Sequence, residues 1–187
     1  MTETEIIQKL QQGNEPAFKM LVETYQKLVV NTCFGLLQNT EDAEDIAQEV
    51  FIEVFRSIQN FRADAKLSTW LYRIAVNRSL NHIRDNKRRK WFQSFDDVVK
   101  EKNLQLNHYA SENPGTELEN LQRANILHEA IGALPENQKT AFTLHKFEDL
   151  SYKEIAEIME MSLESCRNLI YRAIRTLREN VLDKRGK

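Results

Sequence analysis

TEDAEDIAQEVFIEVFRSIQ, residues 40–59, has the most regular apolar spacing in the chain. Its apolar side chains recur at steps of three and four residues, which is the spacing of one face of an α-helix. They are Ala43, Ile46, Ala47, Val50, Phe51, Val54, Phe55 and Ile58. Thr40 is the expected N-cap, and Glu41 and Asp42 suit the positive end of the helix dipole. The stretch therefore predicts an amphipathic helix with an apolar inner face and an acidic outer face.

Helical patterns continue on both sides of this stretch. Upstream, we expect a short helix over 3–11 and a longer one from Ala17 to Leu36, which Pro16 can begin. Downstream, helical spacing recurs over 67–88, 118–131, 136–147, 151–160 and 163–180. Residues 93–116 have no periodicity, are polar and end in Asn-Pro-Gly, which is typical of a flexible linker. We predict an all-α fold of two small helical domains, residues 1–92 and 117–187, joined by that linker.

The composition excludes several classes of protein. With five Gly and three Pro in 187 residues, a turn-rich all-β fold is not expected. No apolar run is long enough to span a membrane, and no basic start is followed by the apolar stretch of a secretory signal. Cys33 and Cys166 are too few and too far apart for a disulfide framework or a metal site, and both fall on apolar helix faces. These features favour the reducing cytoplasm.

No pattern of catalytic or cofactor-binding residues is found. The four histidines lie in no HExxH or Cys-rich arrangement, neither cysteine has a neighbouring base, and no Gly-rich loop could cradle a phosphate. We therefore expect a protein that is not an enzyme and has no cofactor and no metal ion.

The net charge of −2 hides a strongly uneven distribution. Residues 1–65 have a net charge of −6, residues 66–90 of +7, residues 91–120 of −4 and residues 121–187 of +1. This alternation predicts at least two surfaces with opposite electrostatic preferences.

The basic segment STWLYRIAVNRSLNHIRDNKRRK, residues 68–90, has a polar stripe along its predicted helix. One side of the helix is apolar or small: Leu71, Tyr72, Ala75, Val76, Ser79 and Ile83. The opposite side recurs at helical spacing: Trp70, Arg73, Asn77, Asn81, Arg84 and Arg88. A basic helix end would not explain Arg73 or Asn77, and a membrane-surface helix needs a more apolar face. Asn and Arg beside an aromatic ring suit unpaired nucleic-acid bases, although Trp is more often a core residue.

Residues 151–160 and 163–180 have helix-turn-helix proportions, and Ser151 and Glu154 have the spacing of a capping box. In the second helix the expected inward residues are Cys166, Leu169, Ile170, Ala173 and Leu177. The expected outward residues are Arg167, Asn168, Tyr171, Arg172, Arg175 and Arg178. Outward Arg and Asn side chains suit the major groove of DNA, where they pair with guanine and adenine edges. The alternative is a solvated surface on an ordinary helical hairpin.

The outer face of residues 40–59 would repel DNA. It consists of Glu41, Asp42, Asp45, Gln48, Glu49, Ile52 and Glu53. It is either a solvated face or a docking surface for a basic protein, with Ile52 as an apolar anchor.

Three blocks in order and in register resemble bacterial sigma factors of the extracytoplasmic-function (ECF) group, a branch of the sigma-70 family. They are DAEDIAQEVFIEVFRSI (42–58), FRADAKLSTWLYRIAVNRSLNHIR (61–84) and ALPENQKTAFTLHKFEDLSYKEIAEIMEMSLESCRNLIYRAIRTLRE (133–179). The resemblance implies a non-enzymatic subunit that binds core RNA polymerase and directs promoter-specific initiation. It also implies a linker that threads toward the polymerase active-site channel, and anti-sigma factors are frequent partners in this family.

The resemblance also implies roles for individual residues. The β′ coiled coil of the core polymerase would meet Asp45, Gln48 and Glu49, beside the expected apolar anchor Ile52, and the β subunit is a further expected partner. Melted minus-ten DNA would meet Arg73, Asn77, Asn81, Arg84 and Arg88, with the asparagines on base-contacting positions. The minus-35 duplex would meet Ser165, Arg167, Asn168, Tyr171, Arg172 and Arg175.

The chain departs from the family pattern at two positions. The family often has Gly in the helix-turn-helix turn, where this chain has Glu160, and a second basic residue in the recognition helix, where it has Leu169.

Two other hypotheses remain. A free-standing helix-turn-helix transcription regulator would leave the acidic helix and the Asn stripe without roles. The other alternative is an interaction protein that keeps only a sigma-like shape.

Overall fold

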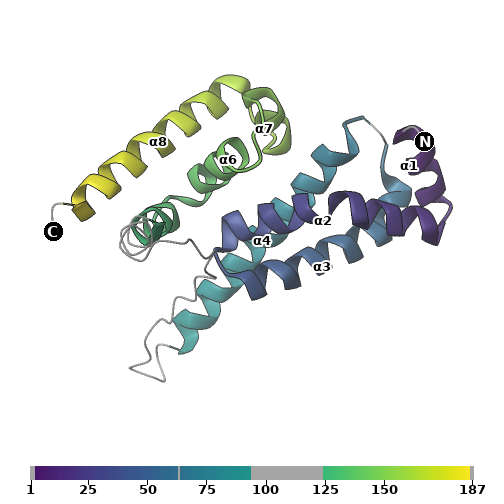
Figure 1. Ribbon diagram of the computed structural model, residues 1–187, viewed down its shortest axis with the longest axis horizontal. Coiled ribbons are helices and arrows are strands. Elements are labelled where there is room, and N and C mark those ends of the chain that lie inside the picture. The colour runs from purple at the N-terminus through teal and green to yellow at the C-terminus, as the bar shows by residue number, and fades with distance from the viewer. Residues whose placement is uncertain (1–2, 63, 94–123, 186–187) are drawn as a thin grey trace, which may run out of the picture.

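The structure is a computed structural model that describes residues 3–62, 64–93 and 124–185, and within these ranges every regular element is a helix (Figure 1). The elements are α1 (Glu3–Gln11), α2 (Glu15–Leu37), α3 (Thr40–Ser57), the 3-10 turn η1 (Ile58–Asn60), α4 (Leu67–Gln93), a helical segment over 124–132, α6 (Glu136–Lys146), α7 (Tyr152–Ile158) and α8 (Leu163–Arg185). The predicted all-α fold is therefore confirmed. Residues 94–116 of the predicted linker lie outside the described residues.

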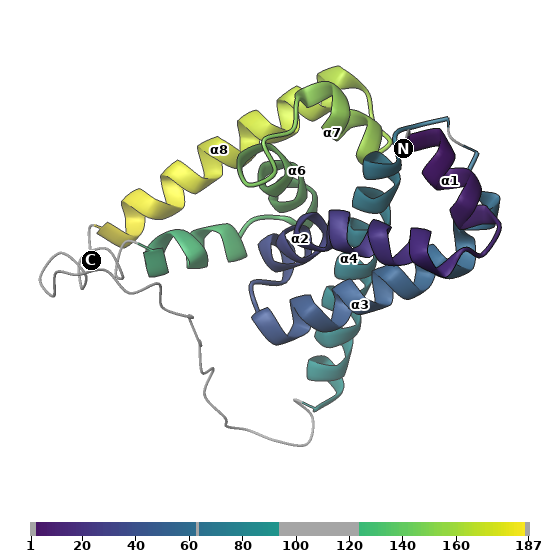
Figure 2. The same cartoon turned by 45° about the vertical axis from the view of Figure 1, so that its right-hand side comes forward.

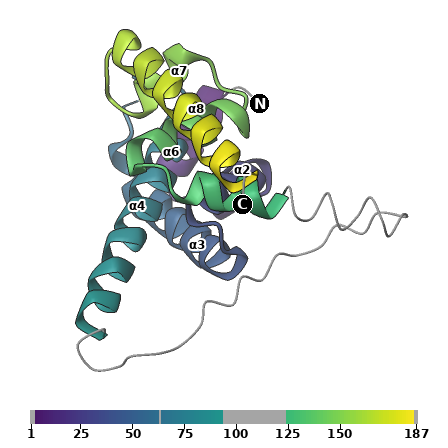
Figure 3. The same ribbon diagram turned by 90° about the vertical axis from the view of Figure 1, so that its left-hand side faces the viewer.

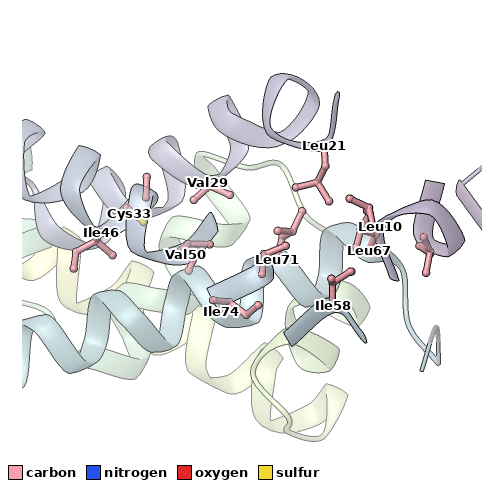
Figure 4. Packing of buried hydrophobic residues seen from close by; sticks show 14 of the residues in the cluster. Leu10, Leu21, Val29, Cys33, Ile46, Val50, Ile58, Leu67, Leu71 and Ile74 are labelled. Atoms are coloured by element: carbon pink, nitrogen blue, oxygen red, sulfur yellow. The ribbon is translucent and has the colours of Figure 1, made fainter. Parts of the chain in front are cut away.

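Helices α1 to α4 form an N-terminal bundle around one apolar core. Figure 4 shows how side chains from these four helices and η1 converge. They include Leu10, Leu21, Val29, Cys33, Ile46, Val50, Ile58, Leu67, Leu71 and Ile74. All ten are at most 8% exposed. Burying a Val, Leu or Ile side chain contributes roughly 1.5–3 kcal/mol to stability.

Polar side chains fix where the helices of the bundle begin. The Asn14 side chain accepts a hydrogen bond from Ala17 N (2.9 Å) at the start of α2. The predicted N-cap of α3 was wrong by one residue, because Asn39 and not Thr40 accepts from Asp42 N (3.0 Å). At α4, Leu67 N donates to a carboxylate oxygen of Glu3 (2.8 Å), so a residue 64 positions earlier in the chain caps this helix.

Helix α4 is buried on two sides. Leu71, Ile74 and Ala75 belong to the N-terminal core, whereas Tyr72 and Val76 belong to a second core built with the C-terminal helices. The apolar residues consequently occupy a broader arc than the single inward side that the sequence predicted. The helix also continues past the predicted end at residue 88 to Gln93.

The C-terminal half, residues 124–185, contains helical segment 124–132, α6, α7 and α8. Residues Ala130, Ile131 and Leu134 pack on Ala173 and Leu177 of α8. At α7 the predicted capping box is confirmed, because the Ser151 hydroxyl accepts from Glu154 N (3.3 Å) and Ser151 N donates to the Glu154 carboxylate (3.0 Å).

The two halves pack directly against each other. Leu36 of α2 and Tyr72 and Val76 of α4 share an apolar cluster with C-terminal residues. The C-terminal members are Ala141, Leu144, Ile155, Ala156, Ile158, Cys166 and Ile170. Helix α6 lies against α2, and α7 lies beside the first turns of α4 (Figure 2). The last turns of α4 project beyond the other helices (Figure 3).

Candidate nucleic-acid interface

The acidic face of α3 is open to solvent as predicted. Asp45, Gln48, Glu49 and Ile52 are all exposed, and the apolar Ile52 side chain is 50% exposed. At the edge nearest α4, Arg78 Nη1 lies 3.5 Å from a Glu49 carboxylate oxygen. A basic partner that docks on Glu49 therefore competes with an arginine of the chain itself.

An exposed phenylalanine extends this face beyond the predicted residues. The sequence placed Phe55 on the inner face of α3, but its side chain is 54% exposed. Its ring makes a T-shaped contact with Phe18 of α2, with the centroids 5.1 Å apart. Helical spacing fails here because it gives the direction of a side chain and not whether a neighbouring helix extends far enough to cover it.

The polar stripe of α4 divides into a covered and an open part. Trp70 is partly buried and packs on Phe61 with the ring centroids 4.9 Å apart, which agrees with the core reading of this tryptophan. Arg73 is 32% exposed, and its Nη2 donates to the backbone carbonyl of Glu157 (2.8 Å). Asn77 and Asn81 are exposed, and their side chains hydrogen-bond to no residue that the structure describes. Their amide groups are thus free to pair with bases.

Basic side chains continue along the distal part of α4. Arg84 and Arg88 are exposed, and Arg84 Nε lies 3.5 Å from a Glu136 carboxylate oxygen in the C-terminal half. Lys87 donates to the other oxygen of Glu136 at 2.8 Å. The Lys87 hydrogen bond is the main reason that the pKa of Glu136 lies below its ordinary value, with Arg84 adding to it.

The outer face of α8 presents the polar row that the sequence predicted. Arg167, Asn168, Tyr171, Arg172 and Arg175 are exposed, and Tyr171 is 70% exposed. Cys166, Ile170, Ala173 and Leu177 are buried, as predicted, and Leu169 is partly buried. A row of arginines flanking an asparagine on the exposed face of a helix has the chemistry to read base edges in a major groove.

The start of α8 is fixed by two serines. The Ser162 hydroxyl accepts from Ser165 N (3.1 Å) and donates to the Ser165 hydroxyl (2.8 Å). Ser165, which the resemblance assigns to the minus-35 duplex, is exposed, but its hydroxyl already takes part in this cap.

Both cysteines are buried, as expected from their apolar positions. Burial raises the pKa of Cys33 to about 11 and raises that of Cys166, so both remain neutral thiols at neutral pH. In the described ranges no group of three or more His, Cys, Asp or Glu side chains is arranged to hold a metal ion. Among the same residues, no helix is both long and apolar enough to cross a membrane.

Models of known protein families match both halves of the chain. Residues 21–89 match Sigma-70 region 2, and residues 124–177 match Sigma-70, region 4. The chain is 36% identical over 180 residues to the ECF RNA polymerase sigma-E factor of Haemophilus influenzae, covering 92% of each chain. The chain belongs to the ECF group of the sigma-70 family. Further sigma factor relatives are the RNA polymerase sigma-H factor of Pseudomonas aeruginosa (34% identical; 90% of this chain, 88% of that one) and the sigma-E factor of Escherichia coli K12 (33%; 92% and 91%).

Solved structures agree with this sigma factor fold. One is CnrH in complex with the cytosolic domain of CnrY, with a TM-score of 0.66, 19% identity and 97% of both chains covered. Another is the sigma factor RpoE in complex with the anti-sigma factor NepR from Bartonella quintana, with a TM-score of 0.66, 20% identity and 88% and 96% of the chains covered. At these identities the likeness concerns the fold.

Proposed function

We propose that this chain is a promoter-specificity subunit that binds core RNA polymerase and directs transcription initiation. The observation that supports this best is the presence of regions 2 and 4, in that order, in one chain that aligns with sigma factors over about nine-tenths of its length. The chain contributes no chemistry of its own and works in the cytoplasm, where promoter DNA and polymerase are present. A free-standing regulator is not favoured, since the sigma factor relatives match both halves.

The acidic face of α3 is proposed to dock on the polymerase. Asp45, Gln48 and Glu49 would face the β′ coiled coil, and Ile52 would supply an apolar anchor. Oppositely charged surfaces accelerate encounter and fix register, whereas buried apolar anchors supply most of the binding energy. Phe55 lies next to this anchor and would enlarge the apolar contact.

The stripe of α4 is proposed to hold melted minus-ten DNA. The free amides of Asn77 and Asn81 would pair with edges of unstacked bases, and Arg73, Arg84 and Arg88 would contact phosphates. Melting here uses binding energy alone, because the unpaired strand is stabilised once its bases reach these side chains.

The outer face of α8 is proposed to read the minus-35 duplex. Arg167, Asn168 and Arg172 would meet base edges in the major groove, while Tyr171 and Arg175 would contact the backbone. The hydroxyl of Ser165 would help to position the start of the helix. An anti-sigma factor is a further proposed partner, in line with the complex of the structural relative RpoE with the anti-sigma factor NepR.

Transcription in vitro tests the proposal directly. Core polymerase is incubated with fragmented genomic DNA, with and without the purified chain, and the 5′ ends of the transcripts are sequenced. We expect discrete start sites, sharing two upstream sequence elements, only when the chain is present. A set of start sites that is the same with and without the chain would refute the proposed function.

A further inference from the structure

Helix α1 presents one stripe of side chains to the connection between η1 and α4. Glu3, Ile7 and Gln11 follow one another at steps of four residues, so they lie along the same side of the helix. The middle member of this stripe, Ile7, is 8% exposed and belongs to the N-terminal core. The two outer members are polar, and their side chains reach from α1 to the backbone at the two ends of the connection.

These polar side chains hold both ends of the connection by hydrogen bonds. Gln11 Nε2 donates to the carbonyl of Phe61, which follows η1 (2.9 Å). At the other end, Leu67 N donates to the Glu3 carboxylate (2.8 Å). Leu67 N belongs to the first turn of α4, where backbone N–H groups have no acceptor within the helix. A carboxylate at this position also suits the positive end of the helix dipole.

Apolar contacts seat α1 firmly, so its stripe is a fixed support. Leu10 is 3% exposed and lies beside Leu67, which is 1% exposed (Figure 4). Burial, and secondarily the charge of Glu3, raises the pKa of Tyr25 on α2. The Glu3 carboxylate is therefore close to α2 as well as to the start of α4.

The connection has no regular structure of its own. Residues 61, 62 and 64–66 belong to no helix, and Arg62 and Asp64 are exposed. A short irregular segment samples many backbone conformations unless contacts with other elements restrict it. The two hydrogen bonds from α1 supply such contacts, one at each end.

The connection adjoins the stripe of α4 that is proposed to hold melted DNA. Phe61 packs on Trp70, and both rings line a hollow of about 170 Å³. Arg62, Asp64 and Arg73 are further lining residues of this hollow. Since Arg73 is also part of the stripe, a strand bound along the stripe reaches the hollow. The position of the connection then decides which side chains the strand meets there.

We propose that Glu3 and Gln11 are positioning residues for promoter opening, which hold the connection between η1 and α4 in the shape that receives melted DNA. The inference rests on the proposed function, since it takes the stripe to be a DNA-binding surface. Neither residue has to touch DNA, because both act through the backbone of the connection. A segment that is already held in its binding shape loses less conformational entropy when the strand arrives. We call these two residues the α1 clamp.

The test removes the hydrogen-bonding groups of the clamp and keeps the helix. Glu3→Met combined with Gln11→Met, the clamp variant, retains side chains of similar length and high helix propensity. Gln8→Met combined with Gln12→Met is the matched control, because both glutamines are exposed and lie in or directly after α1. Glu3→Gln is the conservative variant, since its amide oxygen can accept from Leu67 N in place of the carboxylate. All measurements use the full chain.

The first readout is hydrogen exchange of the Leu67 amide in the free chain, followed by NMR. The clamp variant lacks the acceptor of this amide, so we expect exchange about tenfold faster than in wild type. Glu3→Gln should restore most of the protection, and the control variant should match wild type. Unchanged protection in the clamp variant would overturn the inference, because Glu3 would then not hold the start of α4.

The second readout is the opening of a promoter mapped by the transcription assay, measured with holoenzyme as permanganate reactivity. Each lost hydrogen bond is worth roughly a factor of two to ten in an equilibrium constant, so we expect about tenfold fewer open complexes with the clamp variant. Its affinities for core polymerase and for a duplex that carries only the minus-35 element should equal those of wild type. Equal losses in all three measurements would indicate general structural damage and would overturn the positioning role.

The third readout is the coupling between the clamp and the connection. If the clamp acts by placing this segment, Arg62→Ala should reduce opening in wild type but have little further effect in the clamp variant, where the side chain is already misplaced. Losses that multiply in the combined variant would overturn the inference.

Opening by the unmodified chain separates failure of this inference from failure of the proposed function. A wild type that opens promoters, beside a clamp variant that opens them equally well, would overturn the positioning role alone. A wild type that starts no transcripts with core polymerase would overturn the proposed function and the positioning role together.

Discussion

Lys139 of α6 offers a quantitative test of the packing between the two halves. Its ammonium is mostly buried and donates to Gln38 Oε1 (3.2 Å). Burial, and secondarily the nearby charge of Lys87, lowers its pKa from 10.5 to about 8. This lowering corresponds to a cost of about 3 kcal/mol for keeping the group charged in the folded chain.

The sign of the pH dependence follows from this lowered pKa. Below pH 8, Lys139 is protonated in both the folded and the unfolded chain, and the folded chain carries the whole cost. Between pH 8 and 10.5 the folded chain has released the proton and the unfolded chain retains it, so the cost disappears as the pH rises. From pH 7 to pH 10, Lys139 should therefore add about 2.5 kcal/mol to the free energy of unfolding.

Lys139→Met removes the charge and keeps the length of the side chain. At pH 7 we expect the variant to be more stable than wild type by about 2 kcal/mol, which is the cost removed less about 1 kcal/mol for the lost hydrogen bond. By pH 10 this advantage should have vanished. Urea unfolding followed by circular dichroism at pH 7, 8, 9 and 10 measures the difference, with Lys146→Met, an exposed lysine at the end of the same helix, as the control. A stability difference between the variant and wild type that is the same at all four pH values would refute the reasoning. Cys33, whose pKa is raised to about 11, is present in all the proteins, so its titration cancels in this difference.

The remaining predictions concern the three proposed surfaces. Asp45→Arg combined with Glu49→Arg should abolish capture of core polymerase in a pull-down while the helical spectrum is retained, and Glu23→Arg on α2 should bind normally; unchanged capture by the double variant would exclude this docking face. Asn77→Ala should reduce open-complex formation, followed by permanganate reactivity, more than it reduces duplex affinity, and equal losses would argue against base capture. Arg172→Ala should weaken holoenzyme binding to a mapped promoter about tenfold in anisotropy; full affinity would remove this side chain from the minus-35 contact.

Local structure could be predicted from the sequence because it depends on neighbouring residues. The helical spacing of residues 40–59, the capping box at Ser151 and the outward row on α8 all follow from positions three or four residues apart. The N-cap of α3 was missed because Asn39 and Thr40 both favour that position, and geometry selected the asparagine.

Contacts between distant segments could not be predicted from spacing. Arg73 and Glu157 are 84 positions apart, and nothing in the helical period of α4 indicates which acid or carbonyl its arginines meet. One signal was present: Ile74 lies outside the predicted inward side, so the apolar arc of α4 is wider than one neighbouring layer requires. A helix with such an arc is covered from two directions. In this chain the N-terminal bundle covers one side of α4 and the C-terminal half covers another.

Carboxylates of the C-terminal half pair with basic side chains of α4 and of the residue before it: Glu136 with Lys87, Glu154 with Lys66 and Glu160 with Arg73. These ion pairs have a consequence for how ionic strength acts on this protein. Added salt weakens DNA binding because counterions compete for the phosphates, and it also weakens exposed ion pairs within the chain. The second effect frees cations of α4 that Glu160 and Glu136 hold, while the first lowers the affinity of those cations for phosphate. The logarithm of the DNA affinity of the free chain should accordingly fall less steeply with the logarithm of salt concentration than its number of phosphate contacts would dictate.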